Sequence, residues 1–322
     1  MKACVVQDLS GPSGLVYTDV DDVVGNDDVV VIGVRAAGVC FPDLLLSKGE
    51  YQLKLPPPFI PGMEAAGVVD WAPEESEFKV GDRVSAFGVL GGFAEQVVAP
   101  LANVSRTPAE LDDAEAVSLL VNYNTMYFAL ARRAAMRQGD SVLVLGSAGG
   151  VGTAAIQVAK AMGASKVIAV VHRTGATEFV ESLGADVVLP LTDGWAQAVR
   201  DHTGGRGVDI VVDPVGGQAF DDAIRVLAID GKLLVIGFAA GAIPTVKVNR
   251  LLLRNVGVLG VAWGEYLHRV PGSAGLFAFG VNQLVSAGLK PPPPQRYPLS
   301  EGRAALQALA DGGVFGKLVL EP

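Results

Sequence analysis

Hydrophobic residues change their spacing along the chain, and each spacing predicts a different kind of element. Up to about residue 108, short apolar runs such as 29–35 and 93–98 are separated by Gly, Pro and Asp turns, which is typical of β-strands. From Asp112 the spacing becomes helical. Asp112 is a candidate N-cap, and Glu115 in the first turn complements the helix dipole.

Beyond Gly139, continuous apolar runs alternate with helical segments. This alternation predicts a parallel sheet covered by helices on both faces, which is a doubly wound α/β (Rossmann) arrangement. The expected strands are residues 141–145, 166–171, 187–189, 208–213 and 232–237, and the expected helices are 151–162, 174–183, 195–202 and 220–227.

The alternation stops after Trp263, and this change predicts the domain organisation. A proline run at 291–294 leads to a helix at 300–311 and an apolar strand at 315–320. The simplest architecture joins the first and last segments into one mostly β domain, with the α/β segment inserted. The expected boundaries are 1–119 and 262–322 for the first domain and 120–261 for the second.

Composition excludes several classes of protein. The net charge of −9 over 322 residues lacks the basic surface that nucleic-acid binding requires. The apolar stretch 276–289 is interrupted by Asn282 and Gln283 and is too short to cross a bilayer, so no membrane association is expected. Two cysteines give no disulfide framework, and the first residues do not resemble a signal peptide. We expect a cytoplasmic protein.

A glycine-rich loop joins the strand at 141–145 to the helix that follows it. Glycines at such a turn let the backbone approach a pyrophosphate, and the helix amides stabilise its charge. A tight turn without a ligand would show the same pattern, but the position between strand and helix favours a dinucleotide site. The residues expected to bind the cofactor here are Ser147, Ala148, Gly149, Gly150, Val151 and Gly152.

The end of the second strand of the sheet indicates which dinucleotide is bound. An NAD site would place an acidic residue there to accept hydrogen bonds from the ribose. The chain instead has His172 and Arg173, and Arg173 can pair with a 2′-phosphate, helped by His172 or Lys166. NADPH is therefore the expected cofactor. The alternative is that Arg173 is simply a solvated residue before a helix.

Motifs of one known family are spread over essentially the whole chain, at residues 36–43, 61–67, 80–84, 91–95, 121–127, 148–152, 208–217 and 316–317. Together they resemble the zinc-less quinone oxidoreductase branch of the medium-chain dehydrogenase/reductase superfamily. The resemblance implies a Rossmann domain inserted in a GroES-like domain. It also implies NADPH-dependent hydride transfer to a small conjugated carbonyl substrate, a quinone or an enone.

The resemblance also implies that no zinc is bound. The zinc alcohol dehydrogenases of the superfamily have Cys, His and Cys as catalytic ligands, and the matching positions here are Cys40, Met63 and Val121. Catalytic zinc needs three protein ligands, which one thiolate does not replace. The four-cysteine structural lobe of the zinc enzymes is missing as well.

Further site residues follow from the resemblance. Tyr51 is a candidate proton donor to the carbonyl oxygen of the acceptor, or else an aromatic wall of the pocket. Cys40 is expected to line the site, most simply as an inert buried thiol. Other positions expected near the nicotinamide or the acceptor are Asp43, Tyr127, Asn124, Val215, Gly237, Phe238 and Trp263.

Two other functions remain open at this stage. The same scaffold and chemistry would serve an enoyl-thioester (enoyl-CoA or acyl-carrier-protein) reductase, and the chain could instead be a non-catalytic NADPH-binding structural protein. Many relatives implied by the resemblance dimerise by pairing the edge strands of their nucleotide domains. We therefore expect a homodimer formed through the apolar segment 256–263.

Overall fold

The structure is a computed structural model that describes residues 1–88, 90–173 and 175–322. The chain forms two compact units. The β-rich unit comprises Met1–Val121, Pro271–Asn282 and Lys290–Pro322, and the parallel-sheet unit comprises Asn122–Val270 and Gln283–Leu289. The chain passes from the β-rich unit to the parallel-sheet unit after Val121, two residues beyond the expected boundary. It returns to the β-rich unit after Val270 instead of residue 261, because the helix at Trp263–Arg269 still belongs to the parallel-sheet unit.

The parallel-sheet unit is built on six parallel strands in the order β10-β9-β8-β11-β12-β13. This order places the next two strands of the chain, β9 and β10, on one side of β8 and the later strands β11 to β13 on the other, as in doubly wound folds. The strands are β8 (Ser141–Leu145), β9 (Lys166–Val171), β10 (Val187–Pro190), β11 (Val208–Asp213), β12 (Leu227–Val235) and β13 (Gly257–Gly260).

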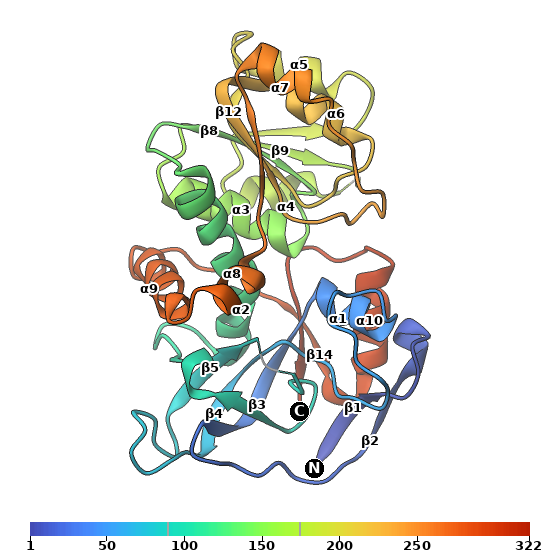
Figure 1. Cartoon of the computed structure of the whole chain (residues 1–322), viewed down its shortest axis with the longest axis vertical. Helices are drawn as coiled ribbons and strands as arrows, with labels where there is room; N and C mark the ends of the chain where they lie inside the picture. Colours follow the sequence, from blue (N-terminus) through green and yellow to red (C-terminus); the bar gives the residue numbers. More distant parts are fainter. Residues whose placement is uncertain (89, 174) are drawn as a thin grey trace. The chain divides into compact units, whose positions relative to one another are not determined.

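Helices cover both faces of this sheet, which explains why its central strands are mostly apolar. All five residues of β8 are buried, and the core between sheet and helices contains Leu143, Ile168 and Phe220. In Figure 1, α3 and α4 lie on one side of β8 and β9, and α5 and α6 lie on the other. The helices are α3 (Gly150–Ala161), α4 (Thr177–Ser182), α5 (Trp195–His202), α6 (Ala219–Arg225), α7 (Val248–Arg254) and α8 (Trp263–Arg269).

The β-rich unit contains a seven-stranded sheet of order β14-β15-β3-β4-β5-β7, in which β6 also pairs with β3, and a separate hairpin of β1 and β2. The long strand β3 connects the two ends of the chain, since it pairs with both β4 and the C-terminal β15. The strands are β1 (Lys2–Val6), β2 (Leu15–Asp19), β3 (Val29–Val39), β4 (Glu64–Trp71), β5 (Arg83–Phe87), β6 (Gln96–Pro100), β7 (Val104–Arg106), β14 (Gln295–Pro298) and β15 (Leu318–Glu321).

Two short helices, α1 (Phe41–Ser47) and α10 (Gly302–Ala310), accompany this sheet and lie side by side in Figure 1. The core of the unit includes Ile32, Phe93 and Leu306, all fully buried. Short 3₁₀ turns occur at Gly11–Gly14 (η1), Leu101–Asn103 (η2) and Leu299–Glu301 (η4).

The helical stretch expected from Asp112 begins as the sequence predicts. Helix α2 (Asp113–Tyr127) is preceded by Asp112, whose carboxylate accepts from the backbone N–H of Glu115 at 2.7 Å, while the Glu115 carboxylate accepts from the N–H of Asp112 at 3.1 Å. This reciprocal capping box fixes where the helix starts. A π-helical segment follows at Phe128–Ala134 (η3), and α9 (Ser273–Ser286) is a further helix of the chain.

Several expected elements are shifted in the structure. The strand expected at 93–98 starts at Gln96, because Phe93 and Ala94 instead pack into the core beside β1. The strand expected at 232–237 is the longer β12, and the last strand begins at Leu318 instead of residue 315. Helix α4 begins at Thr177, and Thr174, its expected start, lies outside the described residues.

No helix in the described residues is long and apolar enough to cross a membrane.

Candidate functional site

The glycine-rich loop lies between β8 and α3, where the sequence predicts a dinucleotide site. Gly146 leaves β8 with φ +58°, a left-handed conformation that favours glycine. The loop is then tied to the neighbouring strand, because the Ser147 hydroxyl, which is fully buried, donates to the Val170 carbonyl at 2.8 Å. Ser147 and Ala148 are therefore buried supports of the loop.

Two glycines of the loop have different steric surroundings. A Cβ at Gly152 would lie 2.4 Å from the Gly146 carbonyl oxygen and 2.5 Å from the Ser147 Cα, so only glycine lets α3 pack this close to the loop. A Cβ at Gly149 would meet only the Gly146 oxygen, at 3.6 Å, and would otherwise extend into open space. Gly150 and Val151 form the first turn of α3, whose amides point out of the helix end. This arrangement suits an anionic ligand.

The other predicted cofactor residues follow the carboxyl ends of neighbouring parallel strands. His172 and Arg173 come directly after β9 and are exposed and half-buried, respectively. Val215 lies two residues beyond the end of β11, and Gly237 and Phe238 lie just beyond β12. Parallel strands β9, β8, β11 and β12 are consecutive neighbours in the sheet, so these residues share one edge with the glycine loop.

Asp213 shapes this edge, although sequence reasoning assigned it no role. It ends β11, and its Oδ1 accepts from the backbone N–H groups of Val215 at 2.9 Å and Gly216 at 2.8 Å. Its Oδ2 is buried and has no hydrogen-bond partner in the structure. Burial raises the pKa of Asp213 above its usual range, against the lowering effect of these two amides. A single acid at the end of an apolar strand was the signal in the sequence.

Three more predicted residues belong to the parallel-sheet unit. Asn124 and Tyr127 lie on the last turns of α2; Asn124 is buried and Tyr127 is half-buried. Trp263 is the first residue of α8 and is buried. Tyr123, one helical position before Asn124, donates its hydroxyl proton to Gln157 of α3.

The β-rich unit contains a buried network of ionisable side chains around Cys40, which we call the Cys40 network; it consists of Cys40, Asp43, Glu64 and Lys317. The Cys40 thiol donates to Glu64 Oε1 at 2.9 Å, and the Lys317 ammonium donates to Cys40 Sγ at 3.1 Å and also to Glu64 Oε1. The second oxygen of Glu64 accepts from the backbone N–H of Val121 at 2.8 Å. The exposed fractions of all four members are between 0% and 7%.

The Glu64 carboxylate and the Lys317 ammonium form a buried ion pair within this network. Burial lowers the pKa of Lys317, but Cys40 and Glu64 outweigh it and raise that pKa above its usual range, so the amine is protonated. Burial, reinforced by the Glu64 charge, raises the pKa of Cys40 well above its usual range. Cys40 is therefore a neutral thiol at neutral pH.

Asp43 and Tyr51 complete the predicted residues of this unit. Asp43 Oδ2 accepts from the Cys40 N–H at 2.8 Å and Oδ1 accepts from the Gly62 N–H at 3.0 Å, so Asp43 caps α1 and fixes the loop before β4. Burial raises the pKa of Asp43 to about 7 despite these hydrogen bonds. Tyr51 is half-buried. Its burial, reinforced by the charge of Asp43, raises its pKa, so the phenol keeps its proton.

Sequence reasoning missed the roles of Glu64 and Lys317. Both residues belong to the motifs that carry the resemblance, but neither was assigned a place in the site. The available signal was a single charged residue at the start of each of two apolar strands, Glu64 in β4 and Lys317 directly before β15. Charged side chains are almost never fully buried unless they are paired, so a buried partner could have been expected for each.

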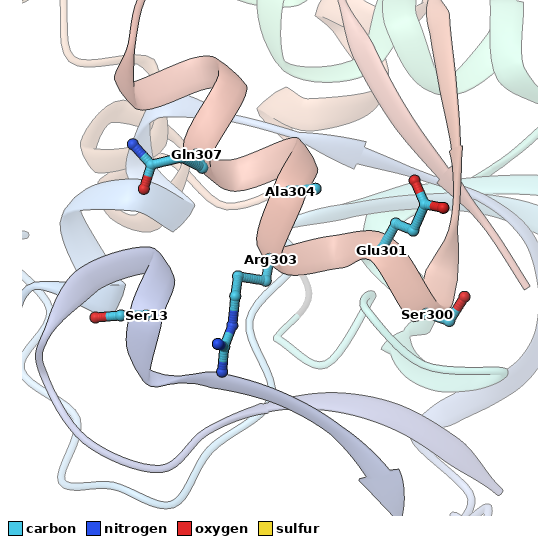
Figure 2. A pocket seen from close by; sticks show the side chains of 6 residues that line it. All are labelled: Ser13, Ser300, Glu301, Arg303, Ala304 and Gln307. Atoms are coloured by element: carbon cyan, nitrogen blue, oxygen red, sulfur yellow. The ribbon is translucent and has the colours of Figure 1, made fainter.

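A separate hollow of about 460 Å³ lies on the β-rich unit and contains none of the predicted site residues. Figure 2 shows it between η1 and the start of α10, with the Arg303 side chain extending across it. Arg303 is already engaged, because its Nε donates to the Leu15 carbonyl at 3.0 Å. Nothing in this hollow indicates a ligand. Its lining residues are Ser13, Ser300, Glu301, Arg303, Ala304 and Gln307.

Comparison with known proteins agrees with this geometry. Residues 26–109 match the alcohol dehydrogenase GroES-like domain, and residues 150–278 match the family described as zinc-binding dehydrogenase. The chain is 38% identical to bovine (Bos taurus) quinone oxidoreductase-like protein 2 over 239 residues, which is 74% of this chain and 68% of the relative. The chain belongs to the quinone oxidoreductase branch of the medium-chain dehydrogenase/reductase superfamily.

Solved structures place the fold in the same superfamily. A probable oxidoreductase from Mycobacterium abscessus is 60% identical with a TM-score of 0.93, over 100% of this chain and 99% of that one. The quinone oxidoreductase from Thermus thermophilus, also solved with NADPH, is 33% identical with a TM-score of 0.83 over the full length of both chains. The resemblance and the expected fold, a Rossmann-like parallel sheet with a GroES-like domain, are thereby confirmed, and the chain is an oxidoreductase of this superfamily.

Proposed function

We propose that this oxidoreductase uses NADPH to reduce a quinone or another conjugated carbonyl compound, without zinc. The observation that carries the proposal is the contrast between the intact glycine loop and the Cys40 network. The first is open to a dinucleotide, and the second fills the positions at which zinc relatives hold their metal. Hydride transfer to an acceptor that needs no Lewis acid fits both the glycine loop and the Cys40 network.

The residues present fit a phosphorylated dinucleotide. Gly149 leaves open space next to the first turn of α3, and the amides there can bind a pyrophosphate. Arg173, after β9, is placed where NAD-specific folds have an acid, and its guanidinium can pair with a 2′-phosphate. NADPH-bound structures of similar proteins support the same choice.

The residues present do not fit a zinc ion. Of the three ligand positions implied by the family, Met63 offers only a thioether and Val121 only its backbone N–H, which is already bonded to Glu64. The thiol of Cys40 lies between the Glu64 carboxylate and the Lys317 ammonium. A cation entering here would have to displace a buried ammonium. In the described residues, no group of three His, Cys, Asp or Glu side chains could hold a metal.

The chain's own side chains would then orient the acceptor and supply a proton. Bound NADPH supplies the hydride, and the negative charge that develops on the acceptor oxygen needs a hydrogen-bond donor. Tyr51 is the candidate, because its raised pKa keeps the phenol protonated at neutral pH. Cys40 contributes an uncharged wall whose proton is directed to Glu64.

The test is NADPH oxidation, followed by its near-ultraviolet absorbance, against a panel of quinones, enones and one enoyl-CoA, with NADH measured alongside. We expect turnover with quinones or enones and a preference for NADPH. Turnover with the enoyl-CoA alone would replace this proposal with a thioester reductase. NADPH binding without turnover on any acceptor would favour the non-catalytic alternative. Zinc added to metal-free protein should leave the rate unchanged.

We further propose that two copies of this chain form a homodimer through the edge strand β13. This strand lies at one end of the six-stranded sheet, within the predicted segment 256–263. Nearby in sequence, α7 exposes Val248, Leu252 and Leu253, with exposed fractions of 73–77%. Apolar side chains beside an unpaired strand edge favour association. Light scattering after size exclusion should give twice the chain mass, and a monomer mass would refute the proposal.

A further inference from the structure

The Cys40 network brings a thiol and a primary amine into direct contact. Lys317 Nζ lies 3.1 Å from Cys40 Sγ, and the two side chains are 7% and 4% exposed. The reaction proposed above uses neither the amine nor the sulfur as a reacting group. The proposed reaction therefore does not explain why a thiol and an amine are buried in direct contact.

Strand pairing brings the two residues together. In the antiparallel ladder between β15 and β3, Leu318 pairs with Val39. The chains run in opposite directions, so Lys317, just before Leu318, lies opposite Cys40, just after Val39. Side chains directly opposite in such a ladder have Cβ atoms about 4.5–5.5 Å apart. The backbone of Lys317 is also fixed from its other side, because its carbonyl accepts from Gln295 of β14 at 2.9 Å.

The shared carboxylate supplies the third component of a reactive group. Glu64 Oε1 accepts both the thiol proton of Cys40 and a proton of the Lys317 ammonium. A base in this position can take up the protons that sulfur and nitrogen must lose before they can be joined. Cys4, the other thiol of the chain, instead donates its proton to the Leu299 carbonyl oxygen, at 3.0 Å.

We propose that Cys40 and Lys317 form a redox-dependent covalent cross-link in which one oxygen atom joins Cys40 Sγ to Lys317 Nζ. The oxidant is a peroxide. The first equivalent of hydrogen peroxide oxidises the thiol to a sulfenic acid and leaves one water, as the peroxide O–O bond breaks and an S–O bond forms.

The second equivalent of hydrogen peroxide accepts two electrons from the lysine amine and the sulfenic acid as the lysine nitrogen bonds to the sulfenic oxygen. One N–O bond forms, the peroxide O–O bond breaks, and the hydrogens leave as two waters and one proton, which Glu64 receives. Sulfur and nitrogen are oxidised and two peroxides are reduced, so the cross-linked pair has gained one oxygen and lost two hydrogens, apart from the proton of the ammonium.

Such a bridge would fasten β15 to the cap of α1 and remove the Cys40 thiol from the wall of the proposed site. A thiol reductant should reverse it. The inference concerns the chemistry of this chain alone, so it does not depend on whether quinones are the substrate.

The experiment treats the full-length protein with increasing hydrogen peroxide, blocks free thiols without a reductant, and analyses proteolytic peptides by tandem mass spectrometry. We expect a peptide pair joining Cys40 and Lys317, with a mass equal to the sum of both neutral peptides plus one oxygen and minus two hydrogens. Dithiothreitol added before digestion should abolish it. The peptide containing Cys4 serves as the internal control and should not be joined to any lysine.

Two variants make the result specific. Cys40→Ser removes the sulfur, and Lys317→Arg keeps a cation beside Glu64 but removes the primary amine, so neither variant should give the joined pair. Oxidation of wild-type Cys40 to sulfinic or sulfonic acid without joined peptides would overturn the proposal, as would a Cys40 that stays unoxidised at peroxide levels that oxidise exposed methionines. Because the wild-type spectrum decides the question, poor folding of either variant leaves the test valid.

Discussion

The two units present their site residues in different ways. In the parallel-sheet unit, the glycine loop proposed to bind the cofactor offers mainly backbone amides, and at Gly146 and Gly152 the fold requires the absence of a side chain. In the β-rich unit, the Cys40 network acts through side chains that come from positions up to 277 residues apart in the chain. A backbone site depends on local geometry, whereas a side-chain network depends on which strands are paired.

This difference predicts that the two units fail differently when a residue is changed. Changes in the network should mainly affect folding stability, because its charges are buried and compensate one another. Changes around the glycine loop should mainly affect cofactor binding. Five substitutions test this distinction, from the largest expected effect to the smallest.

Lys317→Met should cause the largest loss of stability. It leaves the Glu64 carboxylate buried without its cation, and breaking such a pair costs about 3–5 kcal/mol. Chemical denaturation followed by circular dichroism measures the free energy of unfolding. The double variant Glu64→Gln with Lys317→Met should recover a large part of the loss. Equal stability of Lys317→Met and the wild type would show that the pair does not hold the unit together.

Gly152→Ala should weaken NADPH binding by roughly a hundredfold or more, equivalent to about 3 kcal/mol. The added Cβ would lie 2.4 Å from the Gly146 oxygen, so α3 has to move away from the loop. Gly149→Ala is the matched control for folding, because its Cβ meets only one atom, at 3.6 Å, and its melting temperature should stay near that of the wild type. Fluorescence titration with NADPH measures the affinities of the wild type and of Gly152→Ala. Unchanged affinity of Gly152→Ala would remove the loop from the site.

Arg173→Glu should raise the dissociation constant for NADPH by about thirtyfold, or about 2 kcal/mol, and that for NADH much less. The reason is that only NADPH has the 2′-phosphate with which Arg173 is expected to pair. Arg137→Glu makes the same change of charge in the turn before β8, at the opposite edge of the sheet, and should affect both nucleotides little. Equal effects of Arg173→Glu on both nucleotides would contradict the assignment.

Tyr51→Phe should lower kcat by about tenfold, equivalent to about 1.4 kcal/mol, with little change in NADPH affinity. The variant keeps the aromatic ring and removes only the hydroxyl that is proposed to donate to the acceptor. Steady-state kinetics at saturating NADPH measures the effect. If kcat does not change, Tyr51 is a wall of the pocket and the proton comes from elsewhere.

Asp43→Asn should flatten the dependence of stability on pH, by up to about 1 kcal/mol per pH unit. Because the folded-state pKa of about 7 lies above the ordinary aspartate value of 3.8, the folded protein binds the extra proton. The stabilisation from Asp43 is therefore complete below pH 3.8 and is lost as the pH rises through 7. Unfolding free energies at several pH values across this interval measure the slope. An unchanged slope in the variant would assign the pH dependence to other groups.

The sequence alone determined much of the parallel-sheet unit. Strand–helix alternation, the contiguous loop 146–152 and the basic pair after β9 are local patterns, and local backbone geometry needs no information about distant residues. The capping box of α2 was predictable for the same reason, since Asp112 and Glu115 are three positions apart.

Only the tertiary structure decided which side chains contact Cys40 and the backbone of Val121. The sequence predicts that Met63 and Val121 cannot bind zinc, but it does not show that Glu64 bridges Cys40 and Val121, or that Lys317 neutralises Glu64. These contacts depend on the pairing of β15 with β3 and of β3 with β4. Pairing register is a property of the assembled sheet, because it is fixed by which faces are buried together and not by the spacing of residues along one strand.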